Sequence, residues 1–169
     1  MPPLSILILC TGNSARSQLA EAILTTLGAT RPAGPIRAAS AGSRPATRVH
    51  PGAIDILAAH GITWGDRTPR QVDTFLGQSF DLVITVCDNA RDACPIFPGA
   101  AARAHWGLPD PAEATEPEAI RAAFSATYDA LHARLAALLA LPLDTLSPDQ
   151  LTTAATAIHA ALPLPTFAE

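Results

Sequence analysis

A junction near the start of the chain limits the folds open to it, because the segment LSILIL (residues 4–9) runs directly into the loop CTGNSAR (residues 10–16). A short, almost uninterrupted apolar run bounded by prolines and a turn predicts a strand that is buried on both faces. Residues 17–28 carry apolar side chains at helical spacing and end at a glycine, which predicts a helix. Strand, loop and helix in this order form the first half of a parallel βαβ unit.

Strands and helices continue to alternate along the chain. The sequence predicts strands at 36–43 and 80–87, and helices at 50–62, 116–141 and 149–162. Residues 88–115 are rich in Pro, Gly and Asp, so we expect a long loop of the kind that tends to be functional, with a short strand near His105 and Trp106. The alternation predicts a parallel α/β sheet, whose ligands bind outside the carboxyl ends of the strands.

Length and composition favour one compact unit and exclude several classes of protein. The chain has 169 residues; we expect residues 1–141 to form the domain and residues 142–169 a helical extension packed on or near it. No apolar run approaches the roughly 18 residues of a membrane-spanning helix, and no basic leader precedes the first strand, so we expect a cytoplasmic protein without a membrane partner. The net charge of −4 gives no electrostatic footprint for nucleic acid. An anionic substrate would have to be held by local donors.

The loop at residues 10–16 combines the parts of an anion-binding site with a cysteine. Its backbone N–H groups can curl inward at the positive end of the following helix, and Gly12 and Asn13 tolerate the backbone angles of such a curl. Arg16 can offer a planar fork to two oxygens, and the same field lowers the pKa of Cys10 and favours a thiolate nucleophile. Ser17 either donates a hydrogen bond to that thiolate or is simply a serine near a helix start. The predicted oxyanion-binding residues are Thr11, Gly12, Asn13, Ser14, Ala15 and Arg16.

The three cysteines, Cys10, Cys87 and Cys94, are an odd number, which argues against a permanent disulfide framework. Cys87 and Cys94 are seven positions apart, whereas a zinc pair more often lies about two to four apart with a second pair elsewhere. Free cysteine is also a common buried apolar residue. For these two cysteines the residues alone therefore leave burial and thiol chemistry open and make a metal site the weaker alternative.

Four strings carry a family resemblance that extends from about Leu4 to Leu141: CTGNSARS (10–17), SAGS (40–43), VCDNARDACPIFPG (86–99) and HWGLPDPA (105–112). They resemble the low-molecular-weight tyrosine phosphatase fold family, and specifically the arsenate reductases built on that fold, because the last two strings separate the reductases from the phosphatases. The resemblance implies a flavodoxin-like, open, parallel four-stranded sheet flanked by helices. It also implies an oxidoreductase that detoxifies arsenate by reducing it to arsenite.

The resemblance assigns a role to each cysteine. Cys10 attacks arsenate, Cys87 attacks Cys10 and releases arsenite, and Cys94 resolves the resulting disulfide into Cys87–Cys94. One dithiol oxidised to one disulfide supplies the electron pair that As(V) needs. Thioredoxin is the expected external reductant, with glutaredoxin and glutathione as the second candidate, and phosphate and sulfate are expected to compete with arsenate. No tightly bound cofactor is expected.

Asp110 lies between prolines in LPDPA and is, by resemblance, the general acid that protonates the departing oxygen, although Pro-Asp-Pro is also common turn chemistry. Phosphatases of this fold generally carry an aromatic residue two positions after the acid, where this chain has Ala112. Two alternatives stay open. One is a low-molecular-weight protein tyrosine phosphatase that hydrolyses phosphomonoesters with Cys10, Arg16 and Asp110; the other is an oxyanion-binding or redox-sensing module.

The last feature that the resemblance implies is a cation-binding site. Certain reductases bind potassium beside the loop through residues that match Asn13, Glu21 and Ser40, plus an aspartate whose place is taken here by Thr63. These residues form a weak candidate potassium site. In the alternative interpretation, Asn13 and Ser40 tie the loop together by hydrogen bonds and Glu21 is a solvated helix residue.

Overall fold

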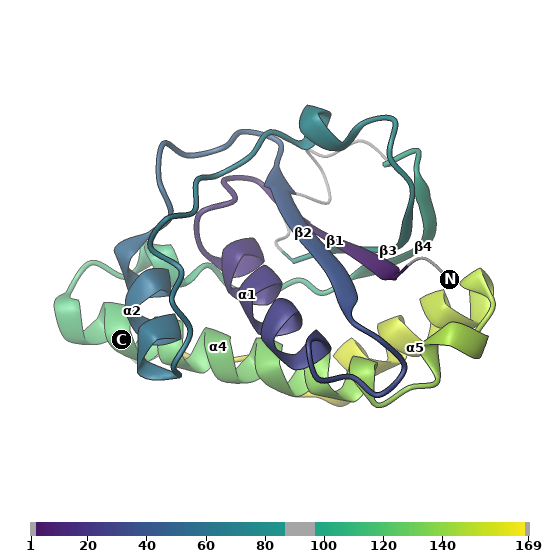
Figure 1. Ribbon diagram of the computed structural model, residues 1–169. Coiled ribbons are helices and arrows are strands. Elements are labelled where there is room, and N and C mark those ends of the chain that lie inside the picture. The colour runs from purple at the N-terminus through teal and green to yellow at the C-terminus, as the bar shows by residue number, and fades with distance from the viewer. Residues whose placement is uncertain (1–2, 87–96, 168–169) are drawn as a thin grey trace.

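The computed structural model describes residues 3–86 and 97–167, and within them four strands form one sheet (Figure 1). The strands are β1 (Leu4–Cys10), β2 (Ile36–Gly42), β3 (Phe80–Thr85) and β4 (Ala100–His105), in the spatial order β2-β1-β3-β4. All neighbouring strands run parallel. The predicted parallel four-stranded α/β sheet is therefore confirmed, and the short strand expected near His105 ends at that residue.

In the described residues, four α-helices accompany the sheet: α1 (Arg16–Gly28), α2 (Pro51–Ala59), α4 (Pro117–Leu139) and α5 (Pro148–Ala161). Short 3-10 helices occur at Val72–Phe75, Pro111–Glu113 and Leu143–Thr145. Figure 1 shows the α-helices gathered on one side of the sheet, while the segment around Val72–Phe75 lies on the other side. Within the described ranges, no helix is both long enough and apolar enough to cross a membrane.

Strand β1 lies between β2 and β3 and contributes to the packing on both faces of the sheet. Ile6 and Ile8 pack among the helices, whereas Leu7 and Leu9 pack on the opposite face with residues such as Phe75. All four of these β1 side chains are buried. Burial on both faces explains why this strand is a nearly continuous apolar run and does not alternate between apolar and polar residues.

The register brings the carboxyl ends of the strands to one edge of the sheet. Cys10 is paired with Gly42, and Leu9 is paired with Thr85. The chain passes so close to Gly42 that a Cβ atom there would lie 2.4 Å from the carbonyl oxygen of Thr11. Only glycine fits this approach, and the loop that follows β1 can therefore lie directly against the end of β2.

The C-terminal helix α5 packs on β4 and α4. Its Leu151 and Ala155 are buried, and the Trp106 indole Nε1 donates a hydrogen bond to the Ala155 carbonyl at 2.9 Å. A capping box between Ser147 and Gln150 begins the helix. The division of the chain at residue 141 stays a prediction.

Arg134 of α4 joins this C-terminal segment to the rest of the molecule. Only 1% of the residue is exposed, and burial lowers the pKa of its guanidinium. The side chain donates to Nδ1 of His159 at 2.9 Å and to the carbonyl oxygens of Leu162 and Pro163 at 3.0 and 3.1 Å. One buried cation thus satisfies acceptors on α5 and on the chain that follows it.

We expect Arg134→Met to lower the free energy of unfolding by about 2–4 kcal/mol, because it removes the hydrogen bonds by which one buried guanidinium joins α4 to α5 and to the chain that follows it. The measurement is urea denaturation followed by circular dichroism. Arg121→Met, which removes an exposed arginine from the same helix, is the matched control and should change stability by less than about 0.5 kcal/mol. Equal losses in the two variants would contradict the role given to Arg134.

Tyr128 makes stability depend on alkaline pH. Burial, and secondarily the neighbouring Asp129 carboxylate, raise the pKa of Tyr128 above its ordinary value of 10.0. The folded state therefore holds the phenolic proton more tightly than the unfolded chain, so this stabilisation is complete below pH 10 and is lost as the pH rises through the folded pKa. We expect the wild type to lose stability above pH 10 more steeply than Tyr128→Phe, measured by urea denaturation at each pH. Parallel losses would show that other groups dominate.

Candidate active site

The candidate nucleophile lies at the end of β1, where the resemblance placed it. Cys10 is the last residue of the strand and Arg16 is the first residue of α1, so the loop between them spans residues 11–15. Only 3% of Cys10 is exposed. The positive end of α1 thus points toward the same loop as the cysteine side chain.

The Cys10 sulfur lies within hydrogen-bond distance of groups on Asn13 and Ser17. The backbone N–H of Asn13 donates to Sγ at 3.1 Å, and the Ser17 hydroxyl lies 2.8 Å from Sγ. Ser17 Oγ also accepts a hydrogen bond from Asn13 Nδ2 at 2.8 Å, which leaves its own proton available for the sulfur. Hydrogen bonds donated to a thiolate favour the charged form. The arrangement therefore suits the nucleophilic role expected for Cys10.

Asn13 organises the loop through four hydrogen bonds of its side-chain amide, two accepted by Oδ1 and two donated by Nδ2. Its Oδ1 accepts from Gln18 Nε2 at 3.0 Å and from the Arg70 backbone N–H at 2.9 Å. Its Nδ2 donates to Ser17 at 2.8 Å and to Ser40 at 2.9 Å. The predicted hydrogen bond between Asn13 and Ser40 is therefore present.

The backbone of the loop adopts a left-handed conformation at Asn13. Asn13 has a φ of 49°, in the left-handed region, and it is the one described residue other than glycine with a positive φ. Gly12, the other residue expected to tolerate such angles, does not adopt a left-handed conformation. The expectation that Asn13 tolerates this conformation is confirmed, and its side-chain amide is held on both sides by hydrogen bonds.

Arg16 presents part of its guanidinium to the site. Its Nη1 donates to the Leu108 carbonyl at 2.8 Å, and its Nη2 lies 3.6 Å from Asp110 Oδ2. Its Nε is buried and has no hydrogen-bond partner among the described residues. A buried donor without an acceptor is costly, and the Nε/Nη2 edge is the edge with which arginine holds two oxygens of one anion. Arg16 therefore has an open position for an oxyanion.

Asp110 faces Arg16 from the loop before the 3-10 helix Pro111–Glu113. Its Oδ1 accepts a hydrogen bond from the backbone N–H of Ala112 at 2.9 Å, which fixes the carboxyl group, and 35% of the side chain is exposed. Ala112 itself is exposed, so no large side chain at that position covers the mouth of the site. The structure thus brings Cys10, Arg16, Ser17 and Asp110 to one edge of the sheet.

The candidate potassium residues are already bonded to protein groups. Glu21 Oε1 accepts from the Ser40 hydroxyl at 2.8 Å, and Glu21 Oε2 pairs with Arg67 Nη1 at 3.3 Å. Both acceptor positions of the Asn13 amide oxygen are taken as well. Glu21 is 6% exposed, so the expectation of a solvated glutamate was wrong. The donor set does not fit a potassium ion, because its oxygens are engaged by N–H and O–H groups.

Other metal chemistry finds no support in the described part of the chain, which contains no group of three or more His, Cys, Asp and Glu side chains placed to hold a metal ion. Cys87 and Cys94 lie outside the described residues. The described chain ends there at Val86, whose N–H donates to the Leu9 carbonyl at 3.0 Å, beside Cys10.

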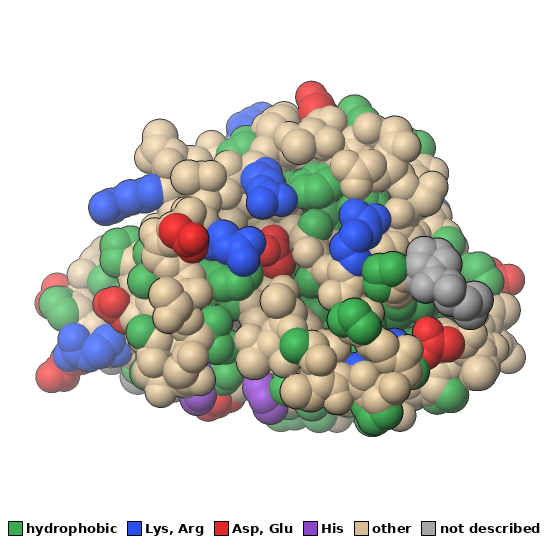
Figure 2. All heavy atoms as spheres, viewed as in Figure 1, with side chains coloured by type: hydrophobic (Ala, Val, Ile, Leu, Met, Phe, Trp, Pro, Cys, Tyr) green, Lys and Arg blue, Asp and Glu red, His purple; other side chains and the backbone are tan. Residues whose placement is uncertain are grey.

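Arginines surround the loop although the net charge of the chain is −4. Arg44, Arg48 and Arg70 are exposed, and their backbones bond to Thr11, Ser14 and Asn13 of the loop, respectively. The chain contains no lysine, so the blue groups on the upper part of the face in Figure 2 are arginines. Arginines therefore lie on the segments that hold the loop, where an anionic substrate would need local donors.

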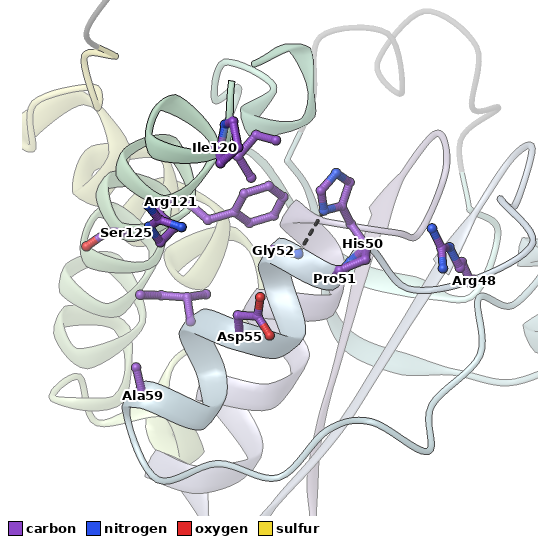
Figure 3. Close-up of a pocket in the computed structure, with 12 residues that line it drawn as sticks. Arg48, His50, Pro51, Gly52, Asp55, Ala59, Ile120, Arg121 and Ser125 are labelled. Carbon is purple, nitrogen blue, oxygen red and sulfur yellow. Dashed lines mark hydrogen bonds between the residues drawn. The ribbon is translucent and has the colours of Figure 1, made fainter. Parts of the chain in front are cut away.

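A separate cavity of about 600 Å³ lies between α2 and α4. Figure 3 shows His50 on one wall and Ile120 and Arg121 on the other. None of the described groups that flank the nucleophile, Arg16, Ser17 or Asp110, lines it. The His50 N–H, however, donates to the Ser14 carbonyl at 2.9 Å, so this wall also supports the loop.

Sequence reasoning missed three residues that hold the loop from behind: Gln18, Trp64 and Arg67. Trp64 Nε1 donates to Gln18 Oε1 at 2.8 Å, and the Arg67 guanidinium lies 4.0 Å from the centre of the Trp64 indole. Gln18 and Glu21 are each 46 positions from their partners Trp64 and Arg67. No local pattern signals contacts over such separations.

A buried cysteine at the end of a central parallel strand, an arginine with an open donor edge and a facing carboxyl group define a class of enzymes that act on tetrahedral oxyanions through a cysteine. A family model described as low molecular weight phosphotyrosine protein phosphatase matches residues 5–151. The chain belongs to this family.

Within the family, the similar proteins include arsenate reductases. One from Brevibacillus brevis is 36% identical over 131 residues, which are 78% of this chain and 90% of that protein. One from Bacillus subtilis is 38% identical over 120 residues, covering 70% and 82%. A solved structure of an arsenate reductase in the phosphate binding state has a TM-score of 0.68 and 28% identity, and covers 81% of this chain and 97% of that chain. A thioredoxin-dependent arsenate reductase of Corynebacterium glutamicum has a TM-score of 0.57 and 28% identity, covering 77% and 59%.

We expect Ser17→Ala to raise the pH midpoint of Cys10 alkylation by roughly 0.5–1.5 units, because the thiolate loses one donor. The measurement is the rate of reaction with iodoacetamide against pH, read by mass spectrometry on the tryptic peptide that ends at Arg16. Thr26→Ala, farther along α1, is the control. An unchanged midpoint in Ser17→Ala would leave Ser17 as a helix-start residue without a role at the sulfur.

Proposed function

We propose that this protein reduces arsenate to arsenite with Cys10 as nucleophile. One observation carries the proposal. The buried Cys10 sulfur accepts a hydrogen bond from the Asn13 N–H, and in the same site the Nε of Arg16 has no hydrogen-bond partner in the described part of the chain. A tetrahedral oxyanion placed between them would satisfy the arginine and bring its central atom to the nucleophile. The similarity to arsenate reductases supports arsenate as that anion.

In the first step the Cys10 thiolate attacks As(V), a sulfur–arsenic bond forms, and one arsenic–oxygen bond breaks. Asp110 gives its proton to the departing oxygen, which leaves as water. Arg16 and the loop amides stabilise the charge on the remaining oxygens. Thr11, Gly12, Asn13, Ser14 and Ala15 supply the loop, and Asn13 and Ser14 already hold it in shape through their hydrogen bonds.

In the second step the Cys87 thiolate attacks the Cys10 sulfur. The new sulfur–sulfur bond replaces the sulfur–arsenic bond, and the electron pair of the broken bond stays on arsenic, which leaves as arsenite. Cys94 then attacks Cys87, which frees Cys10 and leaves a Cys87–Cys94 disulfide. The position of Val86 beside Leu9 supports this order, because the next residue in the chain is Cys87.

Thioredoxin is the reductant we propose for the Cys87–Cys94 disulfide, and glutaredoxin with glutathione is the second candidate. The thioredoxin-dependent reductase of Corynebacterium glutamicum supports the first choice. The cycle requires a compartment that keeps thiols reduced, so we place it in the cytoplasm. Phosphate and sulfate have the same tetrahedral shape and would compete with arsenate. We assign no step of this chemistry to residues 142–169.

No described feature favours the two alternatives over reduction. A tyrosine phosphatase would use the same Cys10, Arg16 and Asp110, but the exposed Ala112 offers no ring on which an aryl substrate can stack. An oxyanion-binding or redox-sensing module would not need the carboxyl group of Asp110 opposite the arginine.

Arsenate-dependent oxidation of NADPH in the presence of thioredoxin and thioredoxin reductase tests the proposal. We expect turnover by the wild type, and a loss of about 10²-fold or more in Cys10→Ser, Cys87→Ser and Cys94→Ser, because each step of the relay needs its own thiol. A parallel assay replaces thioredoxin with glutaredoxin and glutathione.

Hydrolysis of p-nitrophenyl phosphate by the same variants separates reduction from hydrolysis. If Cys87→Ser and Cys94→Ser reduced arsenate as fast as the wild type, the relay would be wrong. If the wild type hydrolysed the ester rapidly but left arsenate unchanged, the phosphatase would be the better description. Binding of arsenate with neither reaction would favour the binding module.

A further inference from the structure

We infer that Arg67 is a positioning residue for the Cys10 nucleophile, with its guanidinium serving as a built-in cation at the buried carboxylate behind the oxyanion loop. Arg67 lies in the segment between α2 and the 3-10 helix Val72–Phe75, 57 positions after Cys10 in the chain. It does not touch the sulfur. Its effect on the site therefore has to pass through other residues.

The first connection runs through Glu21. This carboxylate is 6% exposed, and a buried charge needs a partner of opposite sign. Arg67 Nη1 supplies it at 3.3 Å from Oε2, while Ser40 donates to Oε1 at 2.8 Å. Because the Ser40 hydroxyl donates its proton to Glu21, Ser40 Oγ can accept a hydrogen bond from Asn13 Nδ2, which lies 2.9 Å away.

The second connection runs through Trp64. The guanidinium of Arg67 stacks on the indole with 4.0 Å to the ring centre, and the buried indole donates from Nε1 to Gln18 Oε1 at 2.8 Å. This bond orients the Gln18 amide so that its Nε2 donates to Asn13 Oδ1 at 3.0 Å. The stacking holds the guanidinium in one place, although 39% of the side chain is exposed.

Both connections end at Asn13. With its two acceptor sites and its two N–H groups engaged, the Asn13 side chain has one orientation, and this orientation directs Nδ2 to Ser17. Ser17 then keeps its proton for the Cys10 sulfur, 2.8 Å away. Loss of the Arg67 cation leaves Glu21 buried and unpaired, which favours its neutral form and removes the reason for Ser40 to donate to it. The chain of donors that ends at the thiolate then loses its fixed direction.

The test measures the thiolate directly, in the full-length protein. In Arg67→Met the stem that covers Trp64 remains and only the cation is lost. We expect the pH midpoint of Cys10 alkylation by iodoacetamide to rise by roughly half a unit to one unit, followed on the tryptic peptide that ends at Arg16. Arg67→Lys, which restores a cation, should return most of this shift.

Arg37→Met is the matched control. Arg37 also lies over an aromatic ring, with 4.5 Å to the centre of Phe80, but it sits near the amino end of β2, away from the loop. Its removal should leave the midpoint unchanged. The arsenate assay adds a second readout. Arg67→Met should turn over arsenate slowly at neutral pH and should approach the wild-type kcat at alkaline pH, because there the Cys10 thiolate forms with or without the Arg67 cation.

A double-mutant cycle with Glu21→Gln distinguishes positioning from a long-range effect of charge. The neutral amide introduced by Glu21→Gln needs no cation, so Arg67→Met should have little effect in that background if Arg67 acts through Glu21. An equal shift in both backgrounds, or no shift in the wild-type background, would overturn the inference. The arsenate readout rests on the proposed function, whereas alkylation does not. A shifted midpoint without arsenate turnover would therefore reject the proposed reaction and keep the role of Arg67.

Discussion

The left-handed backbone of Asn13 is the constraint from which the geometry of the site follows. At a φ of 49° the backbone turns its N–H onto the Cys10 sulfur, and the side chain points away from the site into a set of four hydrogen bonds. An L-residue adopts this conformation at a cost, so the surrounding bonds have to offset it. They do so with partners from α1, from β2 and from the segment before the 3-10 helix Val72–Phe75. The loop is thereby ordered before any anion enters, and preorganised donors are the ones that contribute most to catalysis.

The fixed conformation of this loop depends on the architecture of the sheet. Because β1 is central and buried on both faces, the end of the strand is fixed, and Cys10 with it. Gly42, beside it on β2, lets the Thr11 carbonyl approach to a distance that no side chain would permit. The net charge of the chain is negative, but Arg16, Arg44, Arg48 and Arg70 lie on the loop or on the segments that hold it. The positions of the charged residues, and not the net charge of the chain, determine the local electrostatic potential.

The parts of the structure that could be predicted from the sequence are those determined by residues that are neighbours in the sequence. Leu4–Cys10 as a buried strand, the loop after it and the helix that follows are all specified by neighbouring residues, and so were found. The hydrogen bond between Asn13 and Ser40 was expected as the alternative to a potassium site at residues that the resemblance singled out. The contacts of Arg67 with Glu21 and of Arg134 with the C-terminal chain join elements that are far apart, and both involve charged residues that a sequence assigns to the solvent by default. That a charged side chain is buried can be recognised only in the folded structure, where the distant partner that neutralises it lies beside it.

The described site serves the first step of two different reactions equally well. In the proposed mechanism, attack by Cys10, charge stabilisation by Arg16 and proton donation by Asp110 would be the same whether the central atom is phosphorus or arsenic. The reactions diverge in the second step, where either water attacks the central atom or a thiol attacks the sulfur. A hydrolase needs Asp110 again, as a base for water, whereas a reductase needs a thiol near Cys10. The hydrogen bond from the Val86 N–H to the Leu9 carbonyl places Val86, the residue before Cys87 in the sequence, beside the strand that ends at Cys10. The loop after Cys10 therefore does not by itself choose between the two reactions; in the proposed relay that choice depends on the thiol that follows Val86 in the sequence.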